Sequence, residues 1–554
     1  MSLPSDPSFP AVSRRRFVQM AGLLVALPLT GCGSDSDDDR VADTTSGSFR
    51  GSSQAGVLSF KGIPYAQAPV GALRFKSPKA VRPVAGITDA TQFGPSSLQT
   101  LPPYVQWIYT PPQAMSEDCL TLNVWTPDKG GKLPVLVFLH GGAWRTGSSA
   151  LPLVDGQALA SMGCVVVTVT FRLGGLATLS HPAFTDPDTG MQANWQLQDQ
   201  MAALQWVGAN IAQFGGDAAN ICLAGQSAGG TSAAILAQHP TTRSLVRKAV
   251  LLSPARSASP SAFTLTDAAA YTELLAARLG TTVAGLASLP AATVQQGESE
   301  LNQLPLPTTF TSGRGAKAGP IIDGKSYLTD WTRNDWPAST PVLIMNTLTE
   351  GTFFVDLFNV LTNTRATAEL PTTRAAVLTA ITGLAGSPAN AERVMAAYET
   401  AAAAEGRSTL PGDLYVEIYG DGLLRYDGYR YANQLAAAGR NVRYGTYAHA
   451  IKAPARGVPH CAELPMIFGT YGLDFYRTKV GAGAAEATLS QRMMASLVSF
   501  ARDGNPVFAS GSTWPAYQPA QARSVQIGVG DTADVVTAEV PKVAQLQVWT
   551  GILG

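Results

Sequence analysis

Short apolar runs rich in β-branched residues alternate with stretches of helical spacing from residue 135 onward, and this alternation leaves few possible architectures. Strands are expected at 135–139, 164–169 and 221–224, and helices at 197–212 and from Ala228. Strands and helices in this order form a mostly parallel sheet with helices on both faces. Catalytic residues of such folds lie at the carboxyl ends of the strands. The sequence therefore predicts an α/β protein with a large, mostly parallel central sheet.

The second half of the chain extends this pattern and adds helical insertions. Apolar runs at 341–345 and 442–447 predict further strands, whereas 262–305 and 366–406 are rich in Ala, Leu and Thr at helical spacing. We interpret the latter two segments as insertions or lid elements. An α/β fold with such insertions holds most of the 554 residues around one sheet, so one domain is expected at 46–554.

The charge balance argues against a nucleic-acid partner. The chain has 39 Lys and Arg residues against 39 Asp and Glu residues, and phosphate binding needs clustered positive charge. A content of 45% apolar and 14% charged residues supplies a large core and excludes a disordered chain. A globular protein that binds no nucleic acid is therefore expected.

The first 32 residues are typical of an export signal. Three arginines at 14–16 precede Phe17, and the apolar run at 18–29 is too short to cross a bilayer as a stable helix. The arginines before Phe17 are similar to a twin-arginine signal. The residues Leu-Thr-Gly-Cys at 29–32 are similar to the lipobox, in which the cysteine, here Cys32, carries the lipid. A buried N-terminal helix is the alternative interpretation.

An acidic and polar stretch at 33–45 follows the signal and is predicted to be a flexible linker between lipid and domain. The expected location is outside the cytoplasm, as a periplasmic or membrane-anchored bacterial lipoprotein that contacts the membrane only through Cys32. The remaining cysteines have no CxxC or Cys/His spacing, so no metal site and no disulfide scaffold are predicted. These cysteines are Cys119, Cys164, Cys222 and Cys461.

The residues Gly-Gln-Ser-Ala-Gly at 225–229 form the one GxSxG pattern of the chain. An apolar run leads into it and a helix rich in Gly, Ala and Ser leads out, which is the strand, sharp turn and helix of a nucleophile elbow. Flanking glycines are needed because the serine has a strained backbone with close neighbours. Ser227 is therefore the predicted nucleophile, and a tight turn whose serine has no catalytic role is the alternative.

A serine nucleophile needs a base that a carboxylate orients. Of five histidines, His460 lies in a Gly/Pro-rich loop beyond the 442–447 strand, where it can reach back toward Ser227, and His449 is the competitor. For the acid we choose Glu350, which follows the 341–345 strand by a short turn. Asp323 and Asp356 are weaker candidates.

Attack by a serine on a carbonyl also needs donors for the oxyanion of the tetrahedral intermediate. The residues His-Gly-Gly-Ala-Trp at 140–144 follow the 135–139 strand, and small residues there allow backbone N–H groups to face a cavity. Gly142 and Ala143, together with Ala228 after the nucleophile, are the predicted donors. A simple glycine turn is the alternative.

The chain resembles the type B carboxylesterases, relatives of the cholinesterases and of bacterial para-nitrobenzyl esterases. The resemblance covers roughly 49–472 and includes stretches far from the serine motif. These are Phe-Lys-Gly-Ile-Pro-Tyr-Ala at 60–66, Ser-Glu-Asp-Cys-Leu at 116–120, Asp-Gln-Met-Ala-Ala-Leu at 199–204, Phe-Gly-Gly-Asp at 214–217 and His-Cys-Ala-Glu-Leu at 460–464.

This resemblance implies an α/β-hydrolase fold and hydrolysis of small carboxylic esters through a Ser-Glu-His triad at 227, 350 and 460, without a cofactor. The three-donor oxyanion hole of the family falls on Gly142, Ala143 and Ala228. Two other functions stay open. One is a binding or adhesion protein on the same fold, against which the intact triad argues, and the other is hydrolysis of amides or lactones.

Three positions depart from the family pattern. The family pairs the cysteine that Cys119 matches with an upstream cysteine, but Ser97 stands at that place, so Cys119 is expected to be a free thiol. Gln226 stands where relatives often have Glu, and Cys461 where they often have a small residue. Gln226 is either a neutral neighbour that leaves the imidazole without a negative charge beside it, or a hydrogen-bonding spacer in the core.

Overall fold

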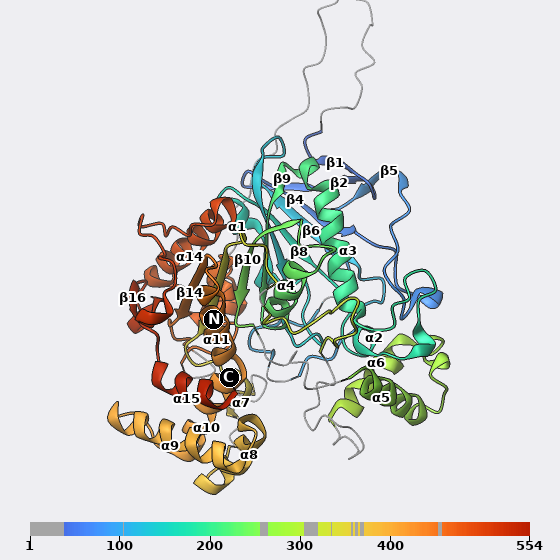
Figure 1. Ribbon diagram of the computed structural model, residues 1–554. Helices are drawn as coiled ribbons and strands as arrows, with labels where there is room; N and C mark the ends of the chain where they lie inside the picture. Colours follow the sequence, from blue (N-terminus) through green and yellow to red (C-terminus); the bar gives the residue numbers. More distant parts are fainter. Residues whose placement is uncertain are drawn as a thin grey trace, which may run out of the picture. The chain divides into compact units, whose positions relative to one another are not determined.

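The central sheet of the protein has parallel strands in its middle and antiparallel strands at its edges. A computed structural model describes residues 38–102, 105–112, 114–254, 264–303, 319–333, 335–355, 358–359, 364–365, 370–452 and 457–553. Within them, an 11-stranded sheet has the order β16-β15-β14-β11-β10-β9-β7-β8-β6-β4-β3 (Figure 1). Its strands are β3 Ser52–Gln54, β4 Val57–Pro64, β6 Thr121–Thr126, β7 Leu133–Leu139, β8 Val165–Val169, β9 Gly216–Gln226, β10 Val246–Leu252, β11 Val342–Thr347, β14 Val442–Tyr447, β15 Arg523–Ile527 and β16 Val535–Glu539.

The strands from β15 to β8 pair in parallel, whereas β16 at one edge and β6, β4 and β3 at the other pair antiparallel. This confirms the predicted, mostly parallel sheet in its centre. The antiparallel edge strands were not predicted, because no helical pattern separates them in the sequence and so the alternation does not reveal them.

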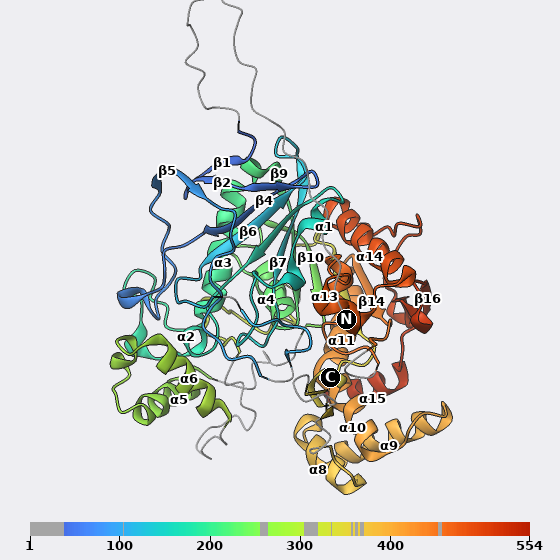
Figure 2. The same cartoon turned by 180° about the vertical axis from the view of Figure 1, so that it is seen from behind.

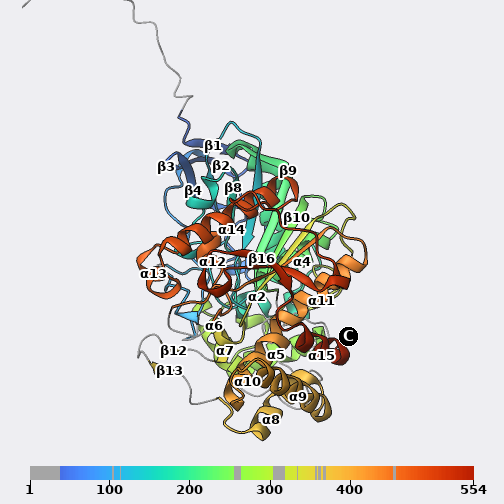
Figure 3. The ribbon, with the colours of Figure 1, turned by 90° about the vertical axis from the view of Figure 1, so that its left-hand side faces the viewer.

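Alternating residues of the central strands supply two separate core layers, because neighbouring side chains in a strand point to opposite faces. Val135, Val137 and Leu139 of β7 belong to one layer, with α3 Trp195–Asn210, α4 Ala228–Gln238 and α11 Tyr426–Ala437. Leu136 and Phe138 belong to the other, with α1 Gln157–Ala160, α12 Leu464–Ile467, α13 Asp474–Val480 and α14 Ala484–Asp503. Figure 3 shows α14 crossing in front of the sheet. The sheet is buried on both faces, as its apolar strands require.

The two Ala-rich segments form helices that join the core differently: those of 262–305 belong to a third hydrophobic cluster, whereas those of 366–406 extend the first of the two core layers. Residues 262–305 contain α5 Leu265–Arg278 and α6 Ala291–Gln303, and α6 lies beside the short α2 Gly175–Thr178 (Figure 2). Residues 366–406 contain α8 Arg374–Ala385 and α9 Pro388–Ala404, which pack on each other and on α15 Val543–Leu553. Two further helices and a short ribbon follow β11 in the chain. They are α7 Thr352–Val355, β12 Phe358–Asn359, β13 Thr364–Arg365 and α10 Pro411–Gly420.

The folded domain begins earlier than the sequence indicates. Strand β1, Val41–Thr44, pairs with β2, Gly47–Arg50, which in turn pairs with β5, Val84–Asp89. The predicted linker at 33–45 is therefore too long at its end, because Ala42 is buried in the core. The export signal at 1–32, Cys32 and the first residues of the linker lie outside the described residues. Among the helices that the structure describes, none combines the length and the apolar character that crossing a bilayer requires.

Candidate active site

Ser227 lies at a sharp turn between the buried end of β9 and the buried helix α4. Its φ of 55° and ψ of −124° are rare for a residue with a side chain, and its N–H donates to Leu252 O at 2.7 Å. A Cβ on Gly225 would lie 2.1 Å from Gly229 O, and a Cβ on Gly229 would lie 2.0 Å from Leu139 O. The predicted strand, turn and helix are thus present, and only glycine fits at the positions two residues before and two residues after the serine.

The glycine loop after β7 lies directly against this turn. A Cβ on Gly141 would lie 3.0 Å from Ser227 Cβ, and one on Gly142 would lie 2.1 Å from Thr146 O. Gly142 and Ala143 have φ of 104° and 55°, so the loop turns back on itself beside the serine. The three predicted oxyanion donors, which include the first residue of α4, therefore lie on two backbone segments that meet at Ser227.

His140, the first residue of the glycine loop, supports the loop. Its ring stacks on Phe171 with centroids 4.3 Å apart, and its Nδ1 lies 2.8 Å from Gly141 O. Burial lowers the pKa of His140 to about 4. The ring is therefore neutral at neutral pH, and we assign its hydrogen to Nδ1, from which the carbonyl oxygen accepts.

Glu350 and His460 form a buried pair after the carboxyl ends of β11 and β14. His460 Nδ1 lies 2.6 Å from Glu350 Oε2, and the two side chains are 2% and 0% exposed. The other oxygen, Glu350 Oε1, accepts from Ser253 Oγ at 2.6 Å, from the N–H of Thr347 at 2.8 Å and from Asn346 Nδ2 at 3.3 Å. One carboxylate oxygen is thus fixed by three donors, and the other is presented to the imidazole.

Burial acts to raise the pKa of Glu350, but opposing interactions outweigh it. Attraction to the protonated form of His460 and the hydrogen bonds from His460, Ser253 and Thr347 hold this pKa below its usual value. The carboxylate is therefore ionised at neutral pH. Its negative charge orients the imidazole with the hydrogen on Nδ1, which leaves Nε2 as the acceptor.

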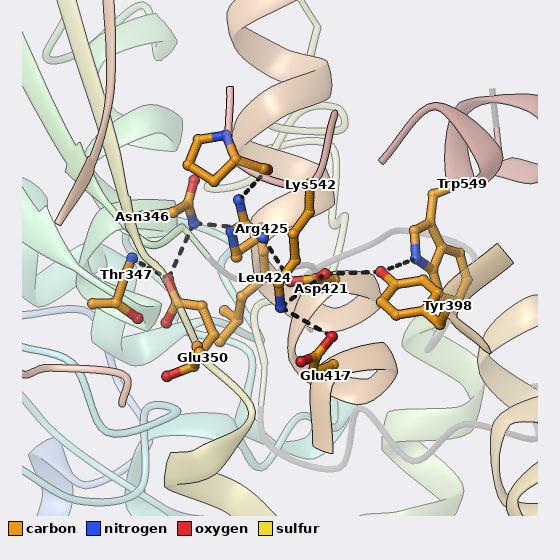
Figure 4. A network of polar contacts seen from close by, with 12 residues as sticks. Asn346, Thr347, Glu350, Tyr398, Glu417, Asp421, Leu424, Arg425, Lys542 and Trp549 are labelled. Atoms are coloured by element: carbon orange, nitrogen blue, oxygen red, sulfur yellow. Dashed lines mark hydrogen bonds and ion pairs between the residues drawn. The ribbon is translucent and has the colours of Figure 1, made fainter. Parts of the chain in front are cut away.

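A polar network continues from Glu350 toward the C-terminal helix α15 (Figure 4). Asn346 Nδ2 lies 3.5 Å from Leu424 O, which belongs to a π-helical turn at Asp421–Arg425. In that turn, Arg425 Nη1 donates to Asp421 Oδ1 at 2.9 Å. Asp421 Oδ2 accepts from the hydroxyl of Tyr398 at 2.8 Å, and this hydroxyl accepts from Trp549 Nε1 of α15 at 3.2 Å. The turn and α15 therefore support the residues behind the acid.

Gln226 contacts His460 directly. Its amide Nε2 lies 3.0 Å from His460 Nε2, its side chain is fully buried, and its Oε1 has no hydrogen-bond partner among the described residues. This position places Gln226 beside the imidazole, and its burial and hydrogen bond also fit the other expected role, a spacer in the core. Because Gln226 precedes Ser227 in the chain, the contact also brings the imidazole to the side of Ser227.

The competing residues have other partners. His449 Nε2 lies 3.1 Å from Glu486 Oε1 of α14. Asp323 accepts hydrogen bonds from the N–H groups of Lys325 and Ser326 in its own turn. Asp356 lies outside the described residues. The structure thus brings Glu350 and His460 together and gives His449 and Asp323 local structural partners.

Two residues that were not predicted from the sequence also contact Glu350. Ser253 directly follows the buried strand β10, which pairs with β9 in the sheet. A polar residue at the carboxyl end of a buried central strand was the signal that could have found it. Asn346, inside β11, carried no such signal, since a single amide in an apolar run has many possible roles.

The cysteines of the described part are free thiols, as predicted for Cys119. Burial raises the pKa of Cys119 to about 12, although a hydrogen bond with Ser97 acts to lower it. Ser97 stands where the family has the partner cysteine. No group of three or more His, Cys, Asp or Glu side chains in the described ranges could hold a metal ion.

The sheet order, the elbow and the buried Glu-His pair define an α/β-hydrolase with a serine at its nucleophile position. The model of the carboxylesterase family matches residues 38–549, and the chain belongs to this family. It is 32% identical to the fumonisin B1 esterase of Sphingopyxis macrogoltabida over 88% of this chain and 86% of that protein. It is 31% identical to the para-nitrobenzyl esterase of Bacillus subtilis (strain 168) over 86% of this chain and 92% of that protein.

A solved PNB esterase structure has the same fold. The two chains share 28% identity with a TM-score of 0.76, over 92% of this chain and 99% of the other. The family and these relatives identify the protein as a carboxylic ester hydrolase.

Proposed function

We propose that the protein hydrolyses small carboxylic esters through a triad of Ser227, His460 and Glu350 and an acyl-enzyme intermediate. Ser227 Oγ attacks the carbonyl carbon while His460 Nε2 takes its proton. His460 then gives this proton to the departing alkoxide, and a water molecule attacks the acyl-enzyme in the same way to release the acid. The observation that carries the proposal is the 2.6 Å contact between His460 Nδ1 and Glu350 Oε2, because it leaves Nε2 as the acceptor. This Nε2 lies 3.0 Å from Nε2 of Gln226, the residue before Ser227 in the elbow.

We assign the stabilisation of the oxyanion to the backbone N–H groups of Gly142, Ala143 and Ala228. The glycine loop and the start of α4 meet at Ser227, which supports a three-donor hole at this place. Backbone donors in a strained but fixed loop need little reorganisation when negative charge develops on the substrate oxygen.

Replacement of the nucleophile tests this function. Ser227→Ala should lower kcat for p-nitrophenyl acetate by about 10⁶-fold, while the midpoint of thermal unfolding stays nearly unchanged. Ser161→Ala, at the exposed end of α1, is the matched control and should keep full activity. A Ser227→Ala protein that keeps a tenth of the original activity contradicts the mechanism.

Amides and lactones are the competing substrates. Activity on p-nitrophenyl esters of increasing chain length, beside activity on the matching anilides, separates an esterase from an amidase. Activity on esters that exceeds activity on anilides at every chain length agrees with the proposal. Absence of turnover on all of them would favour the binding or adhesion function.

The location of the protein is a second, separate proposal. The arginines before Phe17 and the Leu-Thr-Gly-Cys sequence at 29–32 support export and a lipid anchor on Cys32. Stable anchoring needs more than one acyl chain, since one chain of myristoyl length binds a membrane only marginally. Cell fractionation of the unaltered protein and Cys32→Ala tests this. We expect the unaltered protein in the membrane fraction and Cys32→Ala in the soluble fraction, and equal soluble recovery of both contradicts the anchor.

A further inference from the structure

The glycine loop contains three consecutive residues with positive φ. Gly142, Ala143 and Trp144 have φ of 104°, 55° and 55°. Ala143 and Trp144 carry Cβ atoms, so these angles are unfavourable and persist only where the surroundings fix them. Two contacts hold Trp144 itself: its Nε1 donates to Ser232 Oγ of α4 at 2.9 Å, and its carbonyl accepts from the N–H of Gly174 at 2.8 Å.

The next residue, Arg145, ties the loop to helix α6. Its Nη1 and Nη2 donate to Glu298 Oε1 and Oε2 at 2.8 and 2.5 Å, which is a two-pronged guanidinium-carboxylate pair. The side chain of Glu298 is fully buried and that of Arg145 is 17% exposed. Such a pair fixes the relative orientation of its two side chains, because the planar guanidinium of Arg145 can donate both hydrogen bonds only when the carboxylate lies in one orientation.

Helices α5 and α6 hold Glu298 firmly in place. The hydroxyl of Tyr271 in α5 lies 3.2 Å from Glu298 Oε1. Helix α6 packs so closely on α2 that a Cβ on Gly175 would lie 2.9 Å from Glu298 Cβ, and one on Gly174 would lie 2.0 Å from Gln295 Nε2. The N–H of Gly174 donates to the carbonyl of Trp144. Helix α6 is therefore connected to the strained loop in two ways, through the Arg145–Glu298 pair and through Gly174.

We propose that the Arg145–Glu298 pair positions the oxyanion hole, and that the α5–α6 segment acts on the reaction through this pair. In the proposed mechanism neither side chain touches the reacting atoms, and both act by positioning the loop that carries Gly142 and Ala143. The proposal rests on the triad mechanism given above, because it concerns the donors Gly142 and Ala143. Loss of the pair frees the loop to leave its unfavourable backbone angles, which weakens the hole for the charged oxygen more than for a neutral carbonyl.

Two variants break the pair in different ways. Glu298→Gln keeps the size of the side chain and removes its charge, whereas Arg145→Lys keeps the opposite charges and removes the fork. Each should lower kcat for p-nitrophenyl acetate by about tenfold or more and change KM by less than about threefold. Arg145→Lys serves as the main test if Glu298→Gln does not fold.

A pair of ketone inhibitors reports on the hole itself. A trifluoromethyl ketone binds when Ser227 Oγ adds to its carbonyl carbon, the proton passes to His460 and the former carbonyl oxygen becomes an oxyanion. The matching methyl ketone binds mainly without this addition. The ratio of the two inhibition constants therefore measures stabilisation of the oxyanion, and a role in folding alone does not change it. We expect this ratio to fall by about tenfold in both variants.

The chain offers a matched control between the same two helices. Arg278 of α5 and Glu300 of α6 form an exposed ion pair at 3.3 Å, with side chains 43% and 50% exposed. Glu300→Gln should leave kcat and the ketone ratio unchanged. An unchanged ratio in folded Glu298→Gln or Arg145→Lys overturns the positioning role, whatever happens to kcat. A failure of the triad mechanism is distinguishable, since the unaltered protein would then show no preference for the trifluoromethyl ketone.

Discussion

The two sides of the proposed triad are held by different kinds of contact: the nucleophile side around Ser227, and the acid-base side around Glu350 and His460. On the nucleophile side, backbone lies on backbone: a single added Cβ at Gly225 or Gly229 would come within 2.1 Å of a main-chain oxygen. On the acid-base side, Glu350 is held largely by side chains, among them Ser253 and Asn346. The first side is specified by a few adjacent residues and tolerates no extra atom. The second is assembled from distant residues and depends on their charges.

Among the variants that test this comparison of the two sides, the largest effect is expected from removing the negative charge of Glu350. Glu350→Gln keeps the shape of the side chain but no longer stabilises the protonated imidazole or its orientation. We expect kcat for p-nitrophenyl acetate to fall by about 10⁴-fold with the fold retained. Asp323→Asn, at the competing carboxylate, should have no effect on kcat. Comparable losses in both variants would mean that the acid is not assigned correctly.

A smaller loss is expected from adding one atom to the nucleophile side. In Gly142→Ala the new Cβ would lie 2.1 Å from Thr146 O at a φ of 104°, so the loop must shift. Loss of one oxyanion donor lowers kcat by about 10²-fold to 10³-fold.

Gly386→Ala is the control, because it has a similarly unfavourable φ of 85° but open space around its Cβ and lies at the end of α8. It should lose about 1 kcal/mol of stability and no activity. Equal activity of the two variants would contradict the steric argument.

The charges of the acid-base side predict a pH effect on stability. Burial and the negative charge of Glu350 raise the pKa of Glu463 from 4.5 to about 8, and neither oxygen of Glu463 has a hydrogen-bond partner among the described residues. The folded state therefore keeps this proton between pH 4.5 and 8, where the unfolded chain has lost it. Since the folded state binds more protons in that window, stability falls as pH rises through it.

Glu463→Gln imitates the protonated carboxyl and should remove this loss of stability, which is on the order of 3 kcal/mol at about pH 7. Urea unfolding at about pH 5 and about pH 7 measures it: the variant should gain free energy of unfolding relative to the unaltered protein as pH rises. Glu405→Gln, whose native side chain is 52% exposed, is the control. A constant difference between Glu463→Gln and the unaltered protein at both pH values would show that Glu463 is ionised in the folded state.

The smallest expected effect concerns the residue where the two sides meet. In Gln226→Glu a carboxylate would replace the amide that lies 3.0 Å from His460 Nε2. A negative charge there favours the positive imidazole, so the acid limb of the kcat/KM profile should move to higher pH by about 1 unit. Choline esters should improve relative to neutral esters of equal size. Gln521→Glu, on the surface, should move neither, and an unmoved limb in active Gln226→Glu excludes the electrostatic role.

This contrast also explains how much of the site was predictable. Ser227, Gly142 and Ala143 belong to short motifs in which the backbone geometry itself demands certain residues, so the pattern indicates the structure. Glu350 and His460 were predicted from their places after expected strands and from the order of the triad, and the structure brings their side chains to 2.6 Å. Ser253 follows a strand in the same way, but a serine there has no motif around it.

The fold divides in a similar manner. Alternating strands and helices from residue 135 predicted β7, β9 and α4, because periodicity reports burial directly. The edge strands and the start of β1 at Val41 were missed, since short half-exposed strands have weak patterns and pair only through the sheet. The link from Arg145 to Glu298 could not be predicted, because 153 residues separate its two ends.

The polar network behind Glu350 also affects when the site can be completed during synthesis. The elbow at Ser227 and its neighbouring strands emerge from the ribosome before Glu350 and His460. The network that backs the acid closes only with Trp549, whose indole bonds Tyr398. A nascent chain interrupted shortly before Trp549 would carry every residue of the triad and lack the last support of one of them. Because translation delivers that support after every residue of the proposed triad, esterase activity should appear only once Trp549 has left the ribosome, and not gradually with chain length.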